Sequence, residues 1–218
     1  MAIPSRLDRA VEGARTQFEK GFSAWACRHG LSDWEGWFST YDETVYEAVL
    51  RDVGGGDRVL DLGAGDLRLA LRMAERAERV YAVEVNPVVV AHALDGIGLD
   101  LPRNLHVICA NALDVAVPPD VTMAVLLMRH CRHFRAYVDR LVEAGCSRLV
   151  TNARWGMGVE RIDLTRTPVA FDEVREGWYA CRCGATGYSG TGERPLGQVT
   201  EVASCLRCGE NELVGDQR

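Results

Sequence analysis

The sequence predicts an α/β protein with a mostly parallel sheet, helices on both faces, a helical segment at the start and a small cysteine-rich module near the end. Three observations predict it. Apolar segments of strand length alternate with amphipathic segments of helix length. One predicted strand runs through a Gly-x-Gly loop into a helix over residues 57–66. Two closely spaced cysteine pairs follow residue 177.

The first 38 residues are expected to form a helical cap. Residues 5–28 carry apolar side chains at helical spacing, although two glycines interrupt the pattern. Trp25, Trp34 and Trp37 cluster just before the predicted sheet. They either pack the cap onto the sheet or form one wall of a substrate pocket. A helix is then expected from about residue 40 to the glycine turn at 54–56.

The Gly-x-Gly loop is expected to bind a nucleotide. Leu60 and Leu62 belong to a buried strand, Gly63 and Gly65 allow close approach of a ligand, and Asp66 stands where a helix N-cap is expected. Free N–H groups at a helix start suit the polar groups of such a ligand. A dinucleotide site needs glycine where Arg68 stands, which disfavours NAD and FAD.

Two further strand ends carry polar side chains. Glu84 ends the second predicted strand, where a carboxylate can accept hydrogen bonds from both hydroxyls of a ribose. Asn86 and Pro87 read as an N-cap and a first helical residue. The third strand begins near Leu105 and leads to Asn111, whose side-chain carbonyl can accept a bond from an amine.

This series of motifs resembles the class I S-adenosylmethionine-dependent methyltransferases over roughly residues 40–155. The resemblance implies a Rossmann-like, mostly parallel seven-stranded sheet, S-adenosylmethionine as cofactor, and an acidic residue before Gly-x-Gly. The chain departs at Leu67, where the family often has a third glycine, and at Asn111, where the family usually has Asp. Tyr41 either lies over the methionine end of the cofactor or is an ordinary tyrosine. The implied cofactor-binding residues are Asp61, Gly63, Gly65, Glu84, Val85, Asn111, Ala112 and, on the first reading, Tyr41.

The resemblance implies methyl transfer to an acceptor that the sequence does not identify: RNA, protein or a small molecule. The alternative is a non-catalytic cofactor-binding protein whose cysteine module serves interactions. The missing third glycine and the lack of a recognised acceptor motif favour that alternative.

The predicted fourth strand, 121–128, ends in the segment expected to face the acceptor. His130 either takes a proton from the acceptor or supports the loop. Covalent catalysis by Cys131 is disfavoured, because neither Pro nor Thr adjoins it. Arg129, Arg132 and Arg135 suit a phosphate or carboxylate, or else form a solvated helix start. After the fifth strand, Asn152, Arg154 and Trp155 are expected on the same edge of the sheet, with Trp155 stacking on the acceptor or covering the edge.

Four cysteines near the end have nearly the spacing of a zinc ribbon. Cys181, Cys183, Cys205 and Cys208 form a Cys-x-Cys and a Cys-x-x-Cys pair, each followed by glycine. Four thiolates predict one structural Zn²⁺; two disulfides are the alternative. The module, together with the arginines of 129–135, would offer a surface to an RNA or protein partner.

Composition agrees with this reading. The net charge of −6 argues against a polyanion binder held by bulk electrostatics alone. The absence of a membrane-length apolar run and of a signal-peptide pattern predicts a cytoplasmic protein with no membrane partner. The expected boundaries are 1–38 for the cap, 39–176 for the cofactor domain, 177–213 for the ribbon and 214–218 for a tail.

Overall fold

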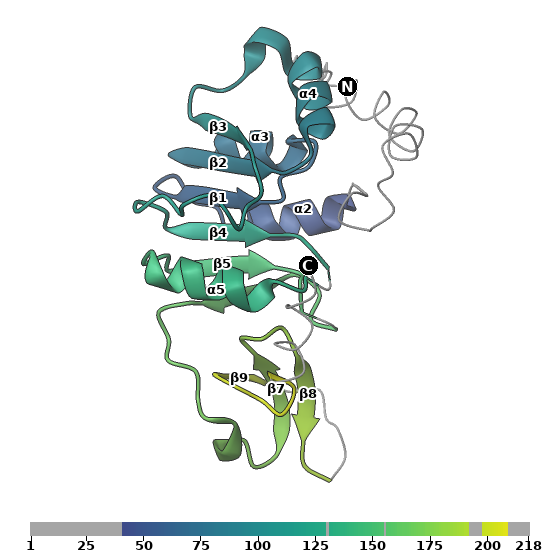
Figure 1. Ribbon diagram of the computed structural model, residues 1–218, viewed down its shortest axis with the longest axis vertical. Coiled ribbons are helices and arrows are strands. Elements are labelled where there is room, and N and C mark those ends of the chain that lie inside the picture. The colour runs from purple at the N-terminus through teal and green to yellow at the C-terminus, as the bar shows by residue number, and fades with distance from the viewer. Residues whose placement is uncertain (1–40, 130, 155, 192–197, 209–218) are drawn as a thin grey trace. The chain divides into compact units, whose positions relative to one another are not determined.

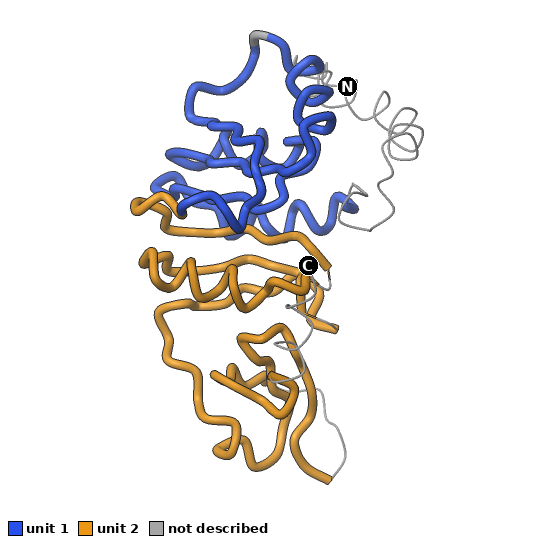
Figure 2. The backbone as a smooth tube through the Cα atoms, in the orientation of Figure 1, with its two compact units in different colours: residues 1–116 blue, residues 117–218 orange. Residues whose placement is uncertain are grey.

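A computed structural model of the chain describes residues 41–129, 131–154, 156–191 and 198–208 (Figure 1). The predicted helical cap of 1–38 and the tail of 214–218 lie outside these residues. The chain divides into two compact units, 1–116 and 117–218 (Figure 2).

The first unit alternates strands and helices as predicted. Its strands pair in parallel, β1 with β2 and β2 with β3. Helices α3 and α4 pack against β2 through their apolar faces. The elements are α2 (Glu43–Leu50), β1 (Arg58–Leu62), α3 (Arg68–Ala74), β2 (Arg79–Glu84), α4 (Pro87–Ile97), the short 3₁₀ helix η2 (Gly98–Asp100) and β3 (Leu105–Cys109).

The second unit contains two kinds of strand pairing. Strands β4 and β5 are parallel, and β6 is antiparallel to β5. A separate three-stranded sheet follows, in the order β8-β7-β9. The elements are β4 (Met123–Leu126), α5 (Phe134–Glu143), β5 (Arg148–Thr151), β6 (Glu160–Asp163), the 3₁₀ helix η3 (Phe171–Glu173), β7 (Gly177–Cys181), β8 (Thr186–Ser189) and β9 (Val199–Val202).

The larger sheet has the order β3-β2-β1-β4-β5-β6. The predicted α/β class and the mostly parallel sheet are confirmed, but the seven strands implied by the family resemblance are not: the described residues supply six. After β6 the chain forms the three-stranded sheet, whose strands pair with one another and not with the larger sheet.

The small sheet has its own core around the cysteines. Val174, Tyr179 and Val202 are buried there together with Cys181 and Cys183. The stretch before η3 joins this sheet, because the Val169 N–H donates to the Glu201 carbonyl (3.1 Å) and the Ala203 N–H donates to the Val169 carbonyl (3.1 Å). The cysteine module therefore begins to pack before its first cysteine.

Candidate cofactor site and metal centre

The loop after β1 is fastened to the end of β2. The N–H groups of Gly63 and Ala64 both donate to the Val83 carbonyl, at 2.9 and 3.0 Å. Gly63 has φ 76° and Gly65 has φ 58°, a left-handed conformation that glycine adopts without strain. The two glycines that the sequence singles out are thus the residues that let the chain turn back over the sheet edge.

Glu84 bridges the two loops that surround the predicted cofactor site. Its Oε2 accepts the Gly65 N–H and its Oε1 accepts the Asn86 N–H, each at 2.9 Å. A carboxylate has about four lone-pair positions, so both oxygens can accept a further bond from a ribose hydroxyl. The next side chain, Val85, is 56% exposed, an apolar surface of the kind that suits the face of a base.

Asp61 is the most unusual polar group of the first unit. It is only 3% exposed, and among the described residues its Oδ2 has no hydrogen-bond partner. Burial, and secondarily the nearby Glu84 carboxylate, raise the pKa of Asp61 to about 7. A buried acceptor without a donor is costly for the ligand-free fold. It fits a ligand that brings a donor or a positive charge to this loop, as the amine and sulfonium groups of S-adenosylmethionine do.

The start of α3 differs from the prediction in one residue. Asp66 is not the N-cap; Leu67 is, and it has φ 64° while being completely buried. Leu67 is the one non-glycine residue with positive φ in the described chain. It stands where the resembling family often has its third glycine, so the backbone keeps the glycine conformation although the side chain has changed.

Asp66 still serves the helix start from one position earlier. Its Oδ1 accepts the Arg68 N–H (3.2 Å), and its Oδ2 pairs with the Arg68 guanidinium (2.6 Å). The Arg68 side chain is 11% exposed and is bound to Asp66.

The remaining predicted cofactor residues lie at the ends of this unit. The Asn111 side chain is exposed, and its Oδ1 accepts the Leu113 N–H at 3.0 Å, which closes a local turn after β3. Ala112 is half-buried within that turn. Tyr41 is half-buried, and its N–H donates to the Tyr46 hydroxyl at 3.4 Å.

Sequence reasoning missed Tyr46. This residue is 5% exposed, and burial followed by the charge of Asp66 raises its pKa to about 12. Asp61 also contributes to its electrostatic environment, so the neutral hydroxyl of Tyr46 belongs to the surroundings of the glycine loop. Its place one turn along a predicted amphipathic helix gave no sign of this, because an inward-facing Tyr usually serves packing.

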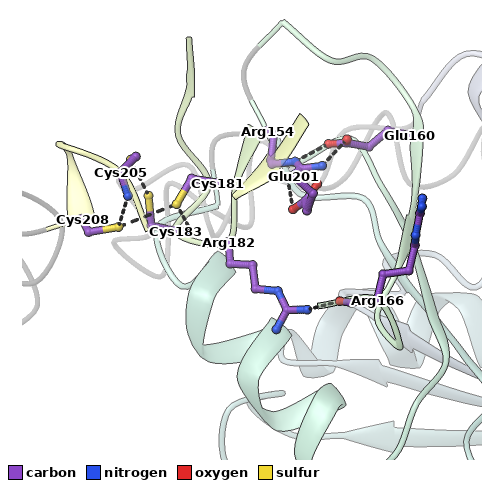
Figure 3. A network of polar contacts seen from close by, with 9 residues as sticks. All are labelled: Arg154, Glu160, Arg166, Cys181, Arg182, Cys183, Glu201, Cys205 and Cys208. Atoms are coloured by element: carbon purple, nitrogen blue, oxygen red, sulfur yellow. Dashed lines mark hydrogen bonds and ion pairs between the residues drawn. The ribbon is translucent and has the colours of Figure 1, made fainter. Parts of the chain in front are cut away.

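The four predicted metal ligands converge. The sulfur atoms of Cys181, Cys183, Cys205 and Cys208 all lie within 4.8 Å of one another. The Sγ atoms of Cys181 and Cys208 are 3.7 Å apart, as are those of Cys183 and Cys205 (Figure 3). A tetrahedral site with Zn–S bonds of about 2.3 Å has S–S edges of about 3.8 Å. A disulfide needs about 2.05 Å, so this geometry favours a metal over two disulfides.

The first knuckle turns at the expected glycine. Gly184 has φ 94°, its N–H donates to the Cys181 carbonyl (3.0 Å), and the Cys183 N–H points at the Cys181 sulfur (3.4 Å). The neighbouring Cys181 thiol, which donates to Cys183, lowers the pKa of Cys183 to about 5. A lowered thiol pKa suits a divalent cation, because cysteine binds metal as the thiolate.

The predicted acceptor edge is only partly described. His130 and Trp155 lie outside the described residues, so the proposed base remains a prediction. Arg129 and Arg132 are exposed, as a phosphate-binding role requires. Asn152 is 6% exposed, and within the described chain its amide nitrogen and oxygen have no hydrogen-bond partner.

Arg154, which follows the end of β5, is buried and ion-paired. It pairs with Glu160 (2.5 Å) and Glu201 (2.6 Å), and its side chain is 2% exposed (Figure 3). Burial alone would lower its pKa; its hydrogen bonds to Glu160 and then Glu201 outweigh that effect and raise the pKa. Arg135 lies within reach of Asp139 (3.6 Å) and of the Cys208 sulfur (3.7 Å), so it too is engaged within the fold.

Comparisons with known proteins bear on the class of protein to which the chain is similar. No protein-family model matches the chain. A probable ribosomal RNA small subunit methyltransferase A from Methanothermobacter thermautotrophicus is 38% identical over 79 residues, which are 35% of this chain and 28% of that protein. The protein of the same name from Methanosarcina mazei is 40% identical over 62 residues, 28% of this chain and 22% of the relative.

The chain spans about a quarter of the length of the curated relatives it matches. A solved RNA methyltransferase from Salinibacter ruber, in complex with S-adenosyl-L-homocysteine, matches 54% of this chain and 82% of its own with 20% identity and a TM-score of 0.46. The relatives, the strand–glycine loop–helix geometry and the mostly parallel sheet confirm the predicted resemblance to the class I S-adenosylmethionine-dependent methyltransferase superfamily. No helix among the described residues is long and apolar enough to cross a membrane.

Proposed function

We propose that this chain is an S-adenosylmethionine-dependent methyltransferase that modifies RNA. The observation that carries the proposal is the pair of carboxyl groups around the Gly63–Gly65 loop: Glu84, which bridges two loops, and Asp61, which is buried with an unused acceptor. Such a pair is costly in an empty fold and useful for a ligand that carries hydroxyls and positive charge.

Each residue has a distinct proposed role toward the cofactor, which supplies an activated methyl group on its sulfonium. Glu84 would accept from the ribose hydroxyls, while Val85 would cover one face of the adenine. Asn111 and Ala112 would meet the adenine edge, with the Asn111 carbonyl accepting from its amine. Asp61 would satisfy a donor near the methionine part.

RNA is the proposed acceptor because the curated relatives are named as probable ribosomal RNA methyltransferases. The exposed Arg129 and Arg132, directly after β4, supply positive charge suited to phosphate. With a net charge of −6, the protein would depend on such local positive groups and not on its overall charge.

The test is transfer of a tritiated methyl group from S-adenosylmethionine into fractionated cell extract. We expect label in RNA that ribonuclease releases, and little in protein or small molecules. Label in another fraction would correct the acceptor class. If S-adenosylhomocysteine binds but no fraction is labelled, the non-catalytic alternative holds; if it does not bind, the cofactor proposal fails.

His130 is the proposed proton acceptor if the attacking group must lose a proton. His130→Ala should then lower turnover by about 10²–10⁴-fold while cofactor affinity stays the same. Loss of folding in this variant would indicate the supporting role instead. Full activity would assign proton removal to another group, or to none.

The four-cysteine cluster is proposed to hold one structural Zn²⁺. Four thiolates leave no open coordination position, so the ion would stabilise the small sheet and would not activate water.

A further inference from the structure

The cysteine module is joined to the residues that directly follow β4 and β5. In open α/β sheets, ligands bind outside the carboxyl ends of the parallel strands. The described residues at those ends in the second unit are 127–129, 131–135 and 152–154. Three independent contacts run from them to the small sheet, all within the second unit.

The first contact is apolar. Phe134, the first residue of α5, is 1% exposed and packs on the first knuckle. A Cβ placed on Gly184 would lie 3.4 Å from the Phe134 Cβ, so the knuckle backbone rests directly on this side chain. The Arg154 guanidinium also lies over the phenyl ring, with 5.8 Å between its central carbon Cζ and the ring centroid.

The second contact joins the second knuckle to the same helix start. The Arg135 guanidinium lies 3.7 Å from the Cys208 sulfur. The Arg135 Nη1 donates a hydrogen bond to this sulfur, so a change in the position of the Cys208 side chain removes the acceptor of Arg135. The metal-ligand geometry and the position of Arg135 are therefore coupled.

The third contact is the buried ion-pair network of Arg154. Its guanidinium holds Glu160 at the start of β6 with one side and Glu201 of β9 with the other. Removing one partner of a buried ion pair leaves the other charge uncompensated. The network therefore resists separation of β6 from β9. Arg154 comes directly after Asn152 and Ala153, at the end of β5.

We propose that the metal centre is a positioning element for methyl transfer: it holds 131–135 and 152–154 in the arrangement that receives the acceptor. This inference deepens the proposed function and rests on it. The four-cysteine cluster then acts on the acceptor step, whereas the predicted cofactor residues all belong to the first unit.

The test compares metal-loaded, metal-stripped and zinc-reconstituted full-length protein. A thiol-binding mercurial, followed by reductant and chelator, removes the ion. We expect S-adenosylhomocysteine affinity to stay within about twofold, while methyl transfer to RNA falls about 100-fold, the scale of a misplacement near 1 Å. Amide hydrogen exchange at 131–136 should rise in the stripped protein, and zinc should restore all three readouts.

Glu201→Gln tests the same inference without removing metal. It takes the charge from one partner of Arg154, and we expect transfer to fall about tenfold with zinc content and cofactor affinity unchanged. Asp172→Asn is the matched control, an exposed carboxylate of the same unit. In the metal-stripped protein, Glu201→Gln should not lower methyl transfer further, because β9 no longer holds Glu201 beside Arg154.

Unchanged transfer and unchanged exchange at 131–136 after stripping would overturn the inference. The exchange measurement also separates it from the proposed function. If the metal-loaded protein binds no cofactor, the proposed function fails. In that case, faster amide exchange at 131–136 after stripping would still show that the metal centre holds this edge. Unchanged exchange would reject the positioning role as well.

Discussion

At the scale of single residues, Glu84 carries the cofactor proposal. Both of its oxygens already accept backbone N–H groups, so the carboxylate is oriented before a ligand arrives. Glu84→Ala should weaken S-adenosylhomocysteine binding by about 1–3 kcal/mol, because ribose hydroxyls and the Gly65 and Asn86 N–H groups all lose their acceptor. Calorimetry measures the change. Glu78→Ala removes an exposed glutamate that pairs with Arg58 and should leave affinity unchanged. Equal affinity in both variants would contradict the ribose assignment.

Asp61 links cofactor binding to stability and pH. Its folded-state pKa of about 7 lies above the ordinary value of 3.8, so the folded state keeps a proton that the unfolded chain has lost. Stability of the ligand-free protein therefore falls as pH rises from 3.8 to about 7, and is constant above.

Asp61→Asn removes this penalty. We expect the variant to be more stable than the parent by about 1–3 kcal/mol at pH 8 and by less at pH 5, measured by urea unfolding without ligand. Its cofactor affinity should fall, as is usual where a functional group is held at a cost. A stability difference that does not change with pH would contradict the raised pKa.

At the scale of elements, the start of α3 shows a conflict between conformation and burial. Leu67 has φ 64°, which costs a leucine about 1–2 kcal/mol, yet it is fully buried. Loss of its packing in Leu67→Ala should cost about 2–5 kcal/mol. Leu67→Gly loses the same packing but relieves the backbone, so we expect it to be about as stable as the Ala variant or up to about 1 kcal/mol more stable.

Leu71 is the matched control for this comparison. It is 1% exposed and lies inside α3, where glycine costs about 1 kcal/mol relative to alanine. Unfolding measurements on the four variants should therefore give Leu71→Gly a lower free energy of unfolding than Leu71→Ala. At position 67 the Gly variant should not be less stable than the Ala variant. The same order at both positions would show that the backbone at Leu67 carries no strain.

Periodicity and turn chemistry predicted much of this fold. The Asn86-Pro87 start of α4 is as expected: the Asn86 Oδ1 accepts the Val88 and Val89 N–H groups at 3.0 and 3.4 Å. Asp66 was misplaced by one residue because local preference strongly disfavours leucine at positive φ, and burial of Leu67 overrides that preference.

Other features depend on partners distant in sequence. The burial of Arg154 was not predicted, since nothing near it in the chain indicates that its ion-pair partner is Glu201, 47 residues later. The sheet was expected to have seven strands because the family has them, whereas here the chain after β6 pairs within itself. The cysteine cluster was predictable, because thiol spacing constrains a metal site directly.

At the scale of the whole molecule, the two proposed ligands belong to different units. Every predicted cofactor residue falls within 1–116, and all four metal ligands fall within 117–218. The first unit buries apolar side chains from its own strands and helices, whereas the small sheet packs much of its core from the cysteines themselves. The metal should therefore matter for the folding of one unit and not of the other.

The protein purified under reducing conditions should contain about one zinc ion per chain. Because binding energy at such a site is folding energy, removing the ion should expose 177–208 to proteolysis while the first unit stays folded and binds S-adenosylhomocysteine. Cys205→Ser should lose the ion, whereas Cys109→Ser, which changes an exposed thiol at the last residue of β3, should retain it. Elemental analysis and thiol titration decide the matter: zinc well below one equivalent, with the four thiols freely reactive or oxidised to disulfides, would contradict the metal centre.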